Sequence, residues 1–265
     1  MSAISKILND SKKIVVKLGS HVLSTEEGMP DLEGIENIVD QLAQLIKEGK
    51  QIIVVTSGAG ICGVGAINKW SRRKDMNYKQ ALCAIGQVEL MMVYKEFFGK
   101  YDIHVGQILL TRDDFGSSER ELHIRNTLFT LIDEGVVPII NENDSVSVEE
   151  IKIGDNDNLS ALTGNLWNAD ALVLLSDIDG VFDKDPKKNS DAKLICEVRD
   201  IDAMEKNIDI KGVGEFGTGG IATKIEAAKR AGIYGIPTIL LNGMKKNIIT
   251  YAKEGKENGT VFLWD

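Results

Sequence analysis

Short apolar runs alternate with longer amphipathic stretches along the whole chain, and this alternation limits the possible folds more than any other feature of the sequence. Lys13–Leu18 has the length and composition of a buried strand, and Leu32–Glu48 then carries apolar residues at helical spacing before Gly49. Strands that alternate with helices predict an α/β fold, with a mostly parallel sheet covered by helices on both faces. The same rules predict strands at 13–18, 51–56, 103–110, 136–141, 171–176, 236–241 and 260–264. They predict helices at 32–48, 79–98, 119–134, 159–167, 223–231 and 246–253. A hairpin arm is expected at 146–153 and an exposed loop at 177–191.

The chain length predicts one large domain or two lobes that share a core, since there are 265 residues. The sequence contains no internal repeat and no low-complexity linker, so we expect one continuous unit over 1–265. A boundary near Asn168–Ala169 is expected to divide it into two parts, about 1–168 and about 169–265.

Composition and charge exclude several classes of function. The chain carries 31 basic and 40 acidic side chains, a net charge of −9, whereas a nucleic-acid-binding protein needs a positive surface. The N-terminal segment lacks an apolar signal core, and no apolar run approaches the roughly 20 residues of a membrane span. We therefore expect a cytoplasmic protein without a nucleic-acid or membrane partner.

The cysteines and histidines give no sign of a disulfide framework or of a metal site. Cys62, Cys83 and Cys196 form no CxxC pair, and we expect them to be buried free thiols in a reducing compartment. The three histidines are far apart and lack the spacing of a zinc site. The sequence therefore predicts no metal ion held by protein side chains.

Polar and glycine-rich residues follow four of the predicted strands. Because ligands of open parallel sheets bind beyond the carboxyl ends of the strands, we expect these residues to meet at one edge of the sheet. The sequence therefore predicts a small-molecule site there, and the loop that follows Asp177 is expected to lie over a nucleotide. The four segments are Lys17-Leu18-Gly19-Ser20, Thr56-Ser57-Gly58-Ala59-Gly60, Asn141-Glu142-Asn143-Asp144 and Ser176-Asp177.

Two glycine-rich segments are typical of anion binding. Gly58–Gly63 has the spacing GxGxxG, but a dinucleotide fold also needs a second strand that ends in an acidic residue about 20 residues further on. The segment Trp70–Asp75 does not have the pattern of a strand, which excludes that fold. Gly58–Gly63 either offers its N–H groups to an anionic substrate or is a plain strand-to-helix turn. The segment 212–220 leads to Lys224 in the first turn of a helix, which suits phosphate. A flexible surface loop would explain its glycines but not the placement of Thr223 and Lys224, and the GxxxxGK[ST] pattern is absent.

A third polar cluster, Gly154-Asp155-Asn156-Asp157-Asn158, precedes a predicted helix. It lacks the glycine and the terminal glutamate of a calcium-binding EF-hand loop. Asp155 or Asp157 could serve as the helix N-cap, but a cap needs one such residue and here four follow one another. We regard the cluster as a further candidate for the site.

In their order and spacing these motifs resemble the signature of the glutamate 5-kinase branch of the amino acid kinase family. The last motif of the series is Gly217-Thr218-Gly219-Gly220-Ile221-Ala222-Thr223-Lys224. The resemblance spans almost the whole chain. It implies a three-layer αβα fold whose N-terminal part holds the amino acid and whose C-terminal part holds ATP. It also implies phosphorylation of the γ-carboxylate of L-glutamate, the first step of proline biosynthesis.

The resemblance assigns roles by position. Lys17 and Lys224 would contact the transferring phosphoryl group, and Asp157 would hold both lysines in place. Mg²⁺ would arrive bound to ATP. The amino acid would be bound by Ser57, Gly58, Asp144 and Asn156, and the nucleotide by Lys17, Gly19, Ser176, Asp177, Thr218, Gly219, Gly220, Ile221, Ala222, Thr223 and Lys224.

The sequence departs from the family pattern in two places. Many bacterial members carry a C-terminal PUA domain, and we expect none here because the chain ends after the kinase region. His21 stands where Ser or Thr is expected, although Lys17 and Gly19 are intact. The resemblance further implies a dimer or tetramer and inhibition by proline.

Two alternatives remain at this point. The chain could be another member of the same fold, such as an acetylglutamate, uridylate or carbamate kinase. It could also be a non-catalytic binding protein on this scaffold, although the presence of Lys17, Asp157 and Lys224 argues against loss of activity.

Overall fold

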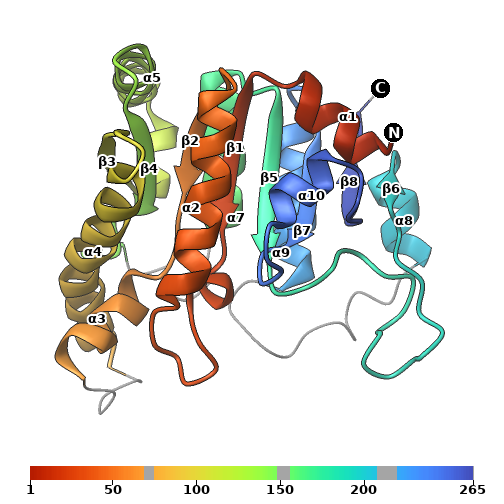
Figure 1. Cartoon of the computed structure of the whole chain (residues 1–265), viewed down its shortest axis with the longest axis horizontal. Coiled ribbons are helices and arrows are strands. Elements are labelled where there is room, and N and C mark those ends of the chain that lie inside the picture. Colours follow the sequence, from red (N-terminus) through yellow and green to blue (C-terminus); the bar gives the residue numbers. More distant parts are fainter. Residues whose placement is uncertain (69–74, 148–155, 208–219, 265) are drawn as a thin grey trace.

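The sheet at the centre of the protein confirms the predicted α/β architecture. The structure is a computed structural model that describes residues 1–68, 75–147, 156–207 and 220–264. Its strands form one sheet in the order β3-β4-β2-β1-β5-β7-β8-β6 (Figure 1). Six neighbouring strands from β3 to β7 are parallel, and β8 runs antiparallel to β7. The strands are β1 (Lys13–Leu18), β2 (Gln51–Val55), β3 (Val105–Leu110), β4 (Val137–Glu142), β5 (Ala171–Ser176), β6 (Glu197–Val198), β7 (Thr238–Asn242) and β8 (Thr260–Phe262).

Helices cover both faces of this sheet, which gives the three layers that the resemblance implied (Figure 1). One layer contains α1 (Ala3–Asp10), α2 (Leu32–Lys47), α3 (Ala59–Ile67), α4 (Met76–Gly99) and α10 (Ile248–Lys253). The other contains α5 (Ser118–Asp133), α7 (Asn156–Trp167), α8 (Ile201–Asn207) and α9 (Ile221–Gly232). Two short 3₁₀ helices, η1 (Ser20–Leu23) and η2 (Arg112–Gly116), follow β1 and β3.

The two hydrophobic cores explain why the central strands are apolar without interruption. In β1 the side chains of Ile14, Val16 and Leu18 enter the core beneath α2, whereas Val15 enters the core beneath α7 and α9. All four side chains are fully buried. A parallel strand with helices on both faces has no solvent side, so every position favours an apolar residue.

The predicted helices and strands are all present, with ends displaced by at most three residues. The largest differences occur at the starts of α4 and α7, which begin at Met76 and Asn156. The sequence patterns missed α1, α3, α8 and β6. Helix α3 was missed because its sequence AGICGVGAI has the composition of a glycine-rich turn. Of the predicted hairpin arm, 148–153 lies outside the described residues.

The prediction of three buried thiols was wrong in part. Cys62 is buried, Cys83 is half-buried, and Cys196 is exposed. Cys196 lies just before β6, at the outer edge of the sheet, where only two residues pair with β8. In the described part of the chain no helix is both long enough and apolar enough to cross a membrane.

Candidate active site

A buried cluster of three charged side chains lies at the carboxyl edge of the sheet. Lys17 Nζ is 2.7 Å from Asp157 Oδ1, and Lys224 Nζ is 3.4 Å from Asp157 Oδ2. The exposed fraction is 5% for Lys17, 0% for Asp157 and 4% for Lys224. The Lys17 contact is an ion pair by its distance, and Oδ1 accepts no well-aligned hydrogen bond from the part of the chain that the structure describes. The structure thus brings together the three residues that were predicted to be catalytic.

Three separate elements deliver these side chains. Lys17 is next to last in β1 and shares the face of Val15, toward α7 and α9, because side chains alternate along a strand. Asp157 lies in the first turn of α7, and Lys224 lies in the first turn of α9. Since α7 and α9 pack against each other on this face, a lysine from the strand meets an acid and a lysine from the two helices.

The electrostatics of the cluster follow from its burial and its pairing. Burial alone would raise the pKa of Asp157, but the charges of Lys17 and Lys224 and the hydrogen bond from Thr223 outweigh this effect, so the pKa lies below its usual value. Burial and the nearby charge of Lys17 lower the pKa of Lys224, although Asp157 opposes this shift. At neutral pH Asp157 is therefore ionised, and it lies between the amino groups of the two lysines.

Thr223 adds a hydroxyl group to the cluster. Its Oγ1 lies 2.7 Å from Asp157 Oδ2 and 2.8 Å from the Gly220 carbonyl oxygen. The single hydroxyl hydrogen serves one acceptor at a time, and the carboxylate is the stronger acceptor. The sequence assigned Thr223 to the nucleotide, and the contact with Asp157 was not foreseen.

A network of amide side chains lies beside the cluster. Asn156 Nδ2 lies within hydrogen-bond distance of the Thr56 carbonyl oxygen (2.9 Å), Ser57 Oγ (2.9 Å) and Asn141 Oδ1 (3.1 Å). Asn141 in turn donates to Gln87 Oε1 over 2.8 Å. The carboxyl ends of β2 and β4 are thereby tied to the first turn of α7. The sequence analysis assigned both Ser57 and Asn156 to the amino acid but did not identify Gln87. A polar residue at an inward-facing position of a predicted helix was the feature that could have indicated Gln87.

The loop after β2 turns sharply into α3. Gly58 has φ +96°, in the left-handed region that favours glycine, and it is the N-cap of α3. Within the described residues no side chain caps this helix, so N–H groups of its first turn are available to a ligand. Gly58–Gly63 is therefore a strand-to-helix turn, which was one of its two interpretations. The geometry of this turn also suits the other interpretation, the binding of an anion.

Asp144 follows β4 and is half-buried beside α4. The Cys83 thiol on α4 is hydrogen-bonded to the Asp144 carboxylate. Burial, together with the negative charges of Asp144 and Glu142, raises the pKa of Cys83 to about 12, so the thiol stays protonated. No feature of the sequence pointed to this pair.

The predicted nucleotide-binding residues lie on the other side of the cluster. Ser176 Oγ donates to Asp177 Oδ1 over 3.0 Å, and His21 Nδ1 lies 3.4 Å from Asp177 Oδ2. The Gly19 N–H donates to the Leu175 carbonyl oxygen over 3.1 Å, which keeps β1 and β5 close. Among the remaining residues, Gly220 is the N-cap of α9, Ile221 is buried and Ala222 is exposed, whereas Thr218 and Gly219 lie outside the described residues.

A cavity of about 240 Å³ opens next to Asp177. Its walls are mainly apolar, with Ile178, Val181 and Phe182 from the loop after β5 and Ile221 and Ile225 from α9. The loop that was predicted to lie over a nucleotide thus forms one wall of a hollow adjoining the predicted phosphate-binding residues.

Comparison with known proteins identifies the family of this chain. Residues 12–242 match the model of the amino acid kinase family. The chain belongs to the amino acid kinase family. Among solved structures of this fold, the UMP kinase from Ureaplasma parvum is 17% identical with a TM-score of 0.67, over 95% of this chain and 98% of that chain. The carbamate kinase from Giardia lamblia bound to AMP-PNP is 16% identical with a TM-score of 0.66, over 97% and 99%.

Curated members of the amino acid kinase family are similar to the chain over nearly all of its length. The glutamate 5-kinase of Alkaliphilus metalliredigens is 57% identical over 98% of each chain. The glutamate 5-kinase of Clostridium perfringens is 41% identical over 97% of each. That of Geobacter metallireducens is 48% identical over 97% of this chain and 69% of its own length.

Proposed function

We propose that this protein is a glutamate 5-kinase, which transfers the γ-phosphoryl group of ATP to the γ-carboxylate of L-glutamate in proline biosynthesis. The observation that carries the proposal is the buried Lys17–Asp157–Lys224 cluster between a network of polar side chains and an apolar cavity. The names of the relatives at 41–57% identity support the choice of glutamate as the acceptor. We place the reaction in the cytoplasm.

The chemistry needs positioning and charge neutralisation more than it needs a base. The side chain of glutamate is already ionised at pH 7, so its oxygen can attack the γ-phosphorus directly. The new bond joins the carboxylate oxygen to phosphorus, the bond to the bridging oxygen of ADP breaks, and ADP leaves. Two anions must approach each other, and Lys17 and Lys224 reduce their repulsion from within a desolvated site. Mg²⁺ carried by ATP would neutralise further phosphate charge.

Asp157 has the role of keeping the two lysines charged and close together. Two buried cations without an acid between them would repel each other and lose protons. Asp157 has no exposed surface and contacts both lysines, so it would hold their amino groups near one another. The cluster keeps one net positive charge, which suits a site that receives phosphate.

The amino acid is proposed to bind where β2, β4 and α7 meet. Ser57, Gly58 and Asn156 would hold the substrate carboxylates through the hydroxyl group, the N–H groups at the start of α3 and the amide. Asp144 would accept a hydrogen bond from the ammonium group. Free glutamate has that group, whereas N-acetylglutamate lacks it.

The nucleotide is proposed to bind on the opposite side of the cluster. The apolar cavity beside Asp177 suits an adenine ring, because small-molecule sites combine apolar walls with a few polar groups. The phosphates would then extend past Gly19 and Ser176 toward the start of α9, with Lys17, Thr223 and Lys224 around the γ-phosphate. Thr218 to Ala222 are proposed to complete the phosphate site.

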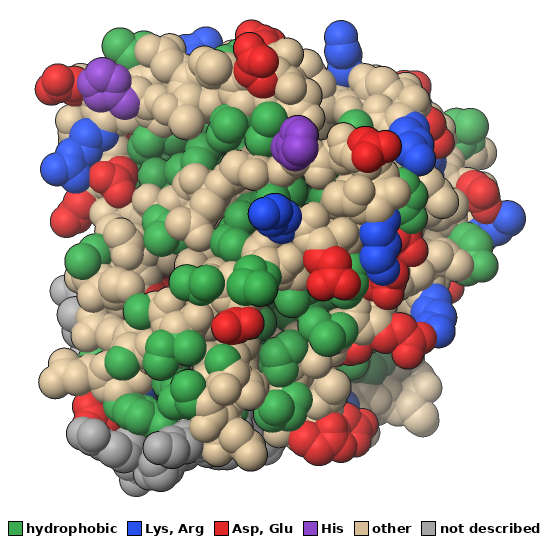
Figure 2. Space-filling view, turned by 60° about the vertical axis from the view of Figure 1, so that its left-hand side comes forward, with side chains coloured by type: hydrophobic (Ala, Val, Ile, Leu, Met, Phe, Trp, Pro, Cys, Tyr) green, Lys and Arg blue, Asp and Glu red, His purple; other side chains and the backbone are tan. Residues whose placement is uncertain are grey.

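We also propose that the protein forms a homo-oligomer and is inhibited by proline. Ile85, Val88 and Met92 on α4 are 39%, 61% and 60% exposed, and their spacing places them on one side of the helix. Figure 2, which brings the side of α4 and the edge strand β3 forward, shows hydrophobic side chains gathered on this face among few charged ones. An apolar stripe of this kind is typical of an interface between subunits.

The test is ADP release by the purified protein with ATP and Mg²⁺. L-glutamate would be compared with N-acetyl-L-glutamate, UMP and carbamate, and hydroxylamine would trap any acyl phosphate. We expect turnover with L-glutamate and a trapped hydroxamate. Turnover with another acceptor instead would keep the lysine mechanism but reject the pocket assignment, and no turnover with any acceptor would favour a binding protein.

A further inference from the structure

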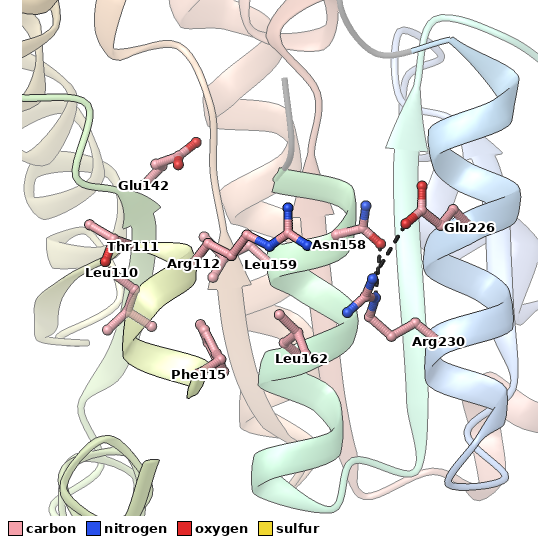
Figure 3. A pocket seen from close by; sticks show the side chains of 10 residues that line it. All are labelled: Leu110, Thr111, Arg112, Phe115, Glu142, Asn158, Leu159, Leu162, Glu226 and Arg230. Carbon is pink, nitrogen blue, oxygen red and sulfur yellow. Dashed lines mark hydrogen bonds and ion pairs between the residues drawn. The ribbon is translucent and has the colours of Figure 1, made fainter. Parts of the chain in front are cut away.

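A groove lined by arginines runs along α7 outside the catalytic cluster, between η2 and α9. Its walls include Arg112 and Phe115 from η2, Asn158 and Leu162 from α7, and Glu226 and Arg230 from α9 (Figure 3). Two adjoining hollows share Arg112, Phe115, Leu162 and Arg230 and so form one continuous groove. We call it the arginine groove. None of its six named residues was assigned to glutamate or ATP.

The two guanidinium groups approach Asn158 from opposite sides. Figure 3 shows Arg112 extending across α7 toward Asn158, and Arg230 reaching the same side chain from α9. Arg230 Nε donates to Asn158 Oδ1 over 3.2 Å, and Arg230 Nη2 donates to Glu226 Oε1 over 3.3 Å. Arg112 is exposed and forms no hydrogen bond or ion pair with any described residue, so its five donors are open to water or to a ligand.

The remaining walls of the arginine groove define what could bind between the arginines. Phe115 and Leu162 provide an apolar surface beside the cations, and three carboxylates also line the groove: Glu226, which pairs with Arg230, Glu142, which accepts a hydrogen bond from Ser147, and Asp113. A planar guanidinium group binds carboxylate in a two-pronged manner, and Arg112 has both prongs available. The combination suits a small carboxylate with an apolar body better than it suits inorganic phosphate.

The first turn of α7 connects this groove to the catalytic cluster. Three consecutive side chains point to three places: Asn156 to Ser57, Asp157 to Lys17 and Lys224, and Asn158 to Arg230. Arg230 also lies on α9, the helix that carries Lys224 at its start. An anion between Arg112 and Arg230 would therefore hold α9 against η2 across α7.

We propose that the arginine groove is an effector site for a small carboxylate with an apolar body. The carboxylate is bound by Arg112 and Arg230, and the apolar body packs on Phe115 and Leu162. By holding α9 in place, the bound carboxylate strengthens ATP binding at the start of that helix. The kinetic consequence rests on the proposed kinase function, whereas the binding itself does not.

Binding is tested with 3-methylbutanoate as the probe and 3-methylbutanamide, which has the same body without the charge, as its control. Titration calorimetry on the full chain should detect the acid and not the amide. Arg112→Gln should weaken binding by about tenfold or more, the effect of losing one charged hydrogen-bonded partner. Because Arg112 has no partner among the described residues, this substitution should leave the fold intact.

Two further variants separate the arginine groove from other anion sites. Lys224→Met disables the catalytic cluster and should bind 3-methylbutanoate as the wild type does. Arg199→Gln removes an exposed arginine that pairs with Glu197 beyond the groove and should also bind normally. The proposal would be overturned if Arg112→Gln bound 3-methylbutanoate as tightly as the wild type does, or if the amide bound as tightly as the acid. It would also be overturned if inorganic phosphate bound at Arg112 more tightly than the acid.

The effector role has its own readout. Saturating 3-methylbutanoate should lower the KM for ATP of the wild type and leave that of Arg112→Gln unchanged. An unchanged KM in a wild type that binds the acid would overturn the effector role. Absence of any kinase activity, with the binding results intact, would instead count against the proposed function alone.

Discussion

At the scale of single residues, the notable feature is a carboxylate without exposed surface between two buried lysines. Removing three charges from water costs free energy that their mutual attraction only partly offsets. Since buried ion pairs add little net stability in general, the charges of Lys17, Asp157 and Lys224 are best explained by chemistry. The excess positive charge is neutralised only when phosphate arrives, which favours ATP binding and the transition state together.

The lowered pKa of Lys224 predicts an alkaline limit to activity. Burial and the charge of Lys17 favour the neutral amine, so Lys224 loses its proton below the usual lysine pKa of 10.5. The kcat/KM for ATP should therefore fall as pH rises through that lowered value. Lys224→Arg should move the fall to higher pH, since a guanidinium group stays charged.

The control for this pH profile lies on the same helix. Lys229 is half-exposed, pairs with Asp202 and Glu205, and has a raised pKa. Lys229→Arg should leave the profile unchanged. If kcat/KM falls at the same alkaline pH in the wild type and in an active Lys224→Arg variant, the group that loses its proton is not Lys224.

At the scale of elements, the position of α3 depends on a close crossing with α4. A Cβ atom at Gly86 would lie 1.8 Å from the Ala59 carbonyl oxygen, and one at Gly63 would lie 2.0 Å from the Leu82 carbonyl oxygen. Both glycines are therefore required by backbone contact between the helices. The crossing fixes the start of α3, where the glutamate carboxylates are proposed to bind.

Gly86→Ala should push α3 away from α4. We expect a loss of about 1–3 kcal/mol in the free energy of unfolding, as for other overpacked sites. The KM for glutamate should rise more than the KM for ATP, because the start of α3 moves and the start of α9 does not. Urea unfolding and steady-state kinetics would measure these effects.

Gly99 offers a matched control within α4, because a Cβ atom there would meet no atom of the described residues within 4 Å. Gly99→Ala should leave stability unchanged or raise it slightly, since alanine favours the helix. A Gly86→Ala variant as stable as Gly99→Ala would show that the helices can separate without cost.

Sequence patterns predicted those helices and strands whose residue pattern has one dominant physical cause. The strands β1, β2 and β5 are buried on both faces, so their apolar runs admitted one interpretation. Helix α3 was not predicted, because its glycines allow close contact with α4 and a single sequence does not distinguish such glycines from those of a turn. The motif glycines and lysines marked the site, but Gln87 and Cys83 became part of it only through the packing of α4.

At the scale of the whole molecule, one sheet carries both proposed substrate sites, and its surface offers a place for self-association. The exposed stripe of Ile85, Val88 and Met92 lies on α4, beside the edge strand β3. Burying such side chains between two copies would remove apolar area from water. A monomer would leave this stripe in contact with water.

Light scattering should therefore give a mass of at least twice the 29.0 kDa of one chain. Met92→Glu should shift the mass toward that of the monomer, because a charge in an apolar interface is costly. Met244→Glu provides the control, since Met244 is 58% exposed but follows β7, which four other strands separate from β3 in the sheet. Equal masses for both variants would place the interface elsewhere.

The central claim is that Asp157 organises two lysines for phosphoryl transfer, and the kcat of Asp157→Asn tests it most directly. ADP formation would be measured with saturating L-glutamate, ATP and Mg²⁺, with the folded fraction of each protein matched by circular dichroism. The account predicts a fall in kcat of roughly 10²–10³-fold, the size seen when one preorganised electrostatic group is lost. A folded Asp157→Asn variant with a kcat within about threefold of wild type would contradict it.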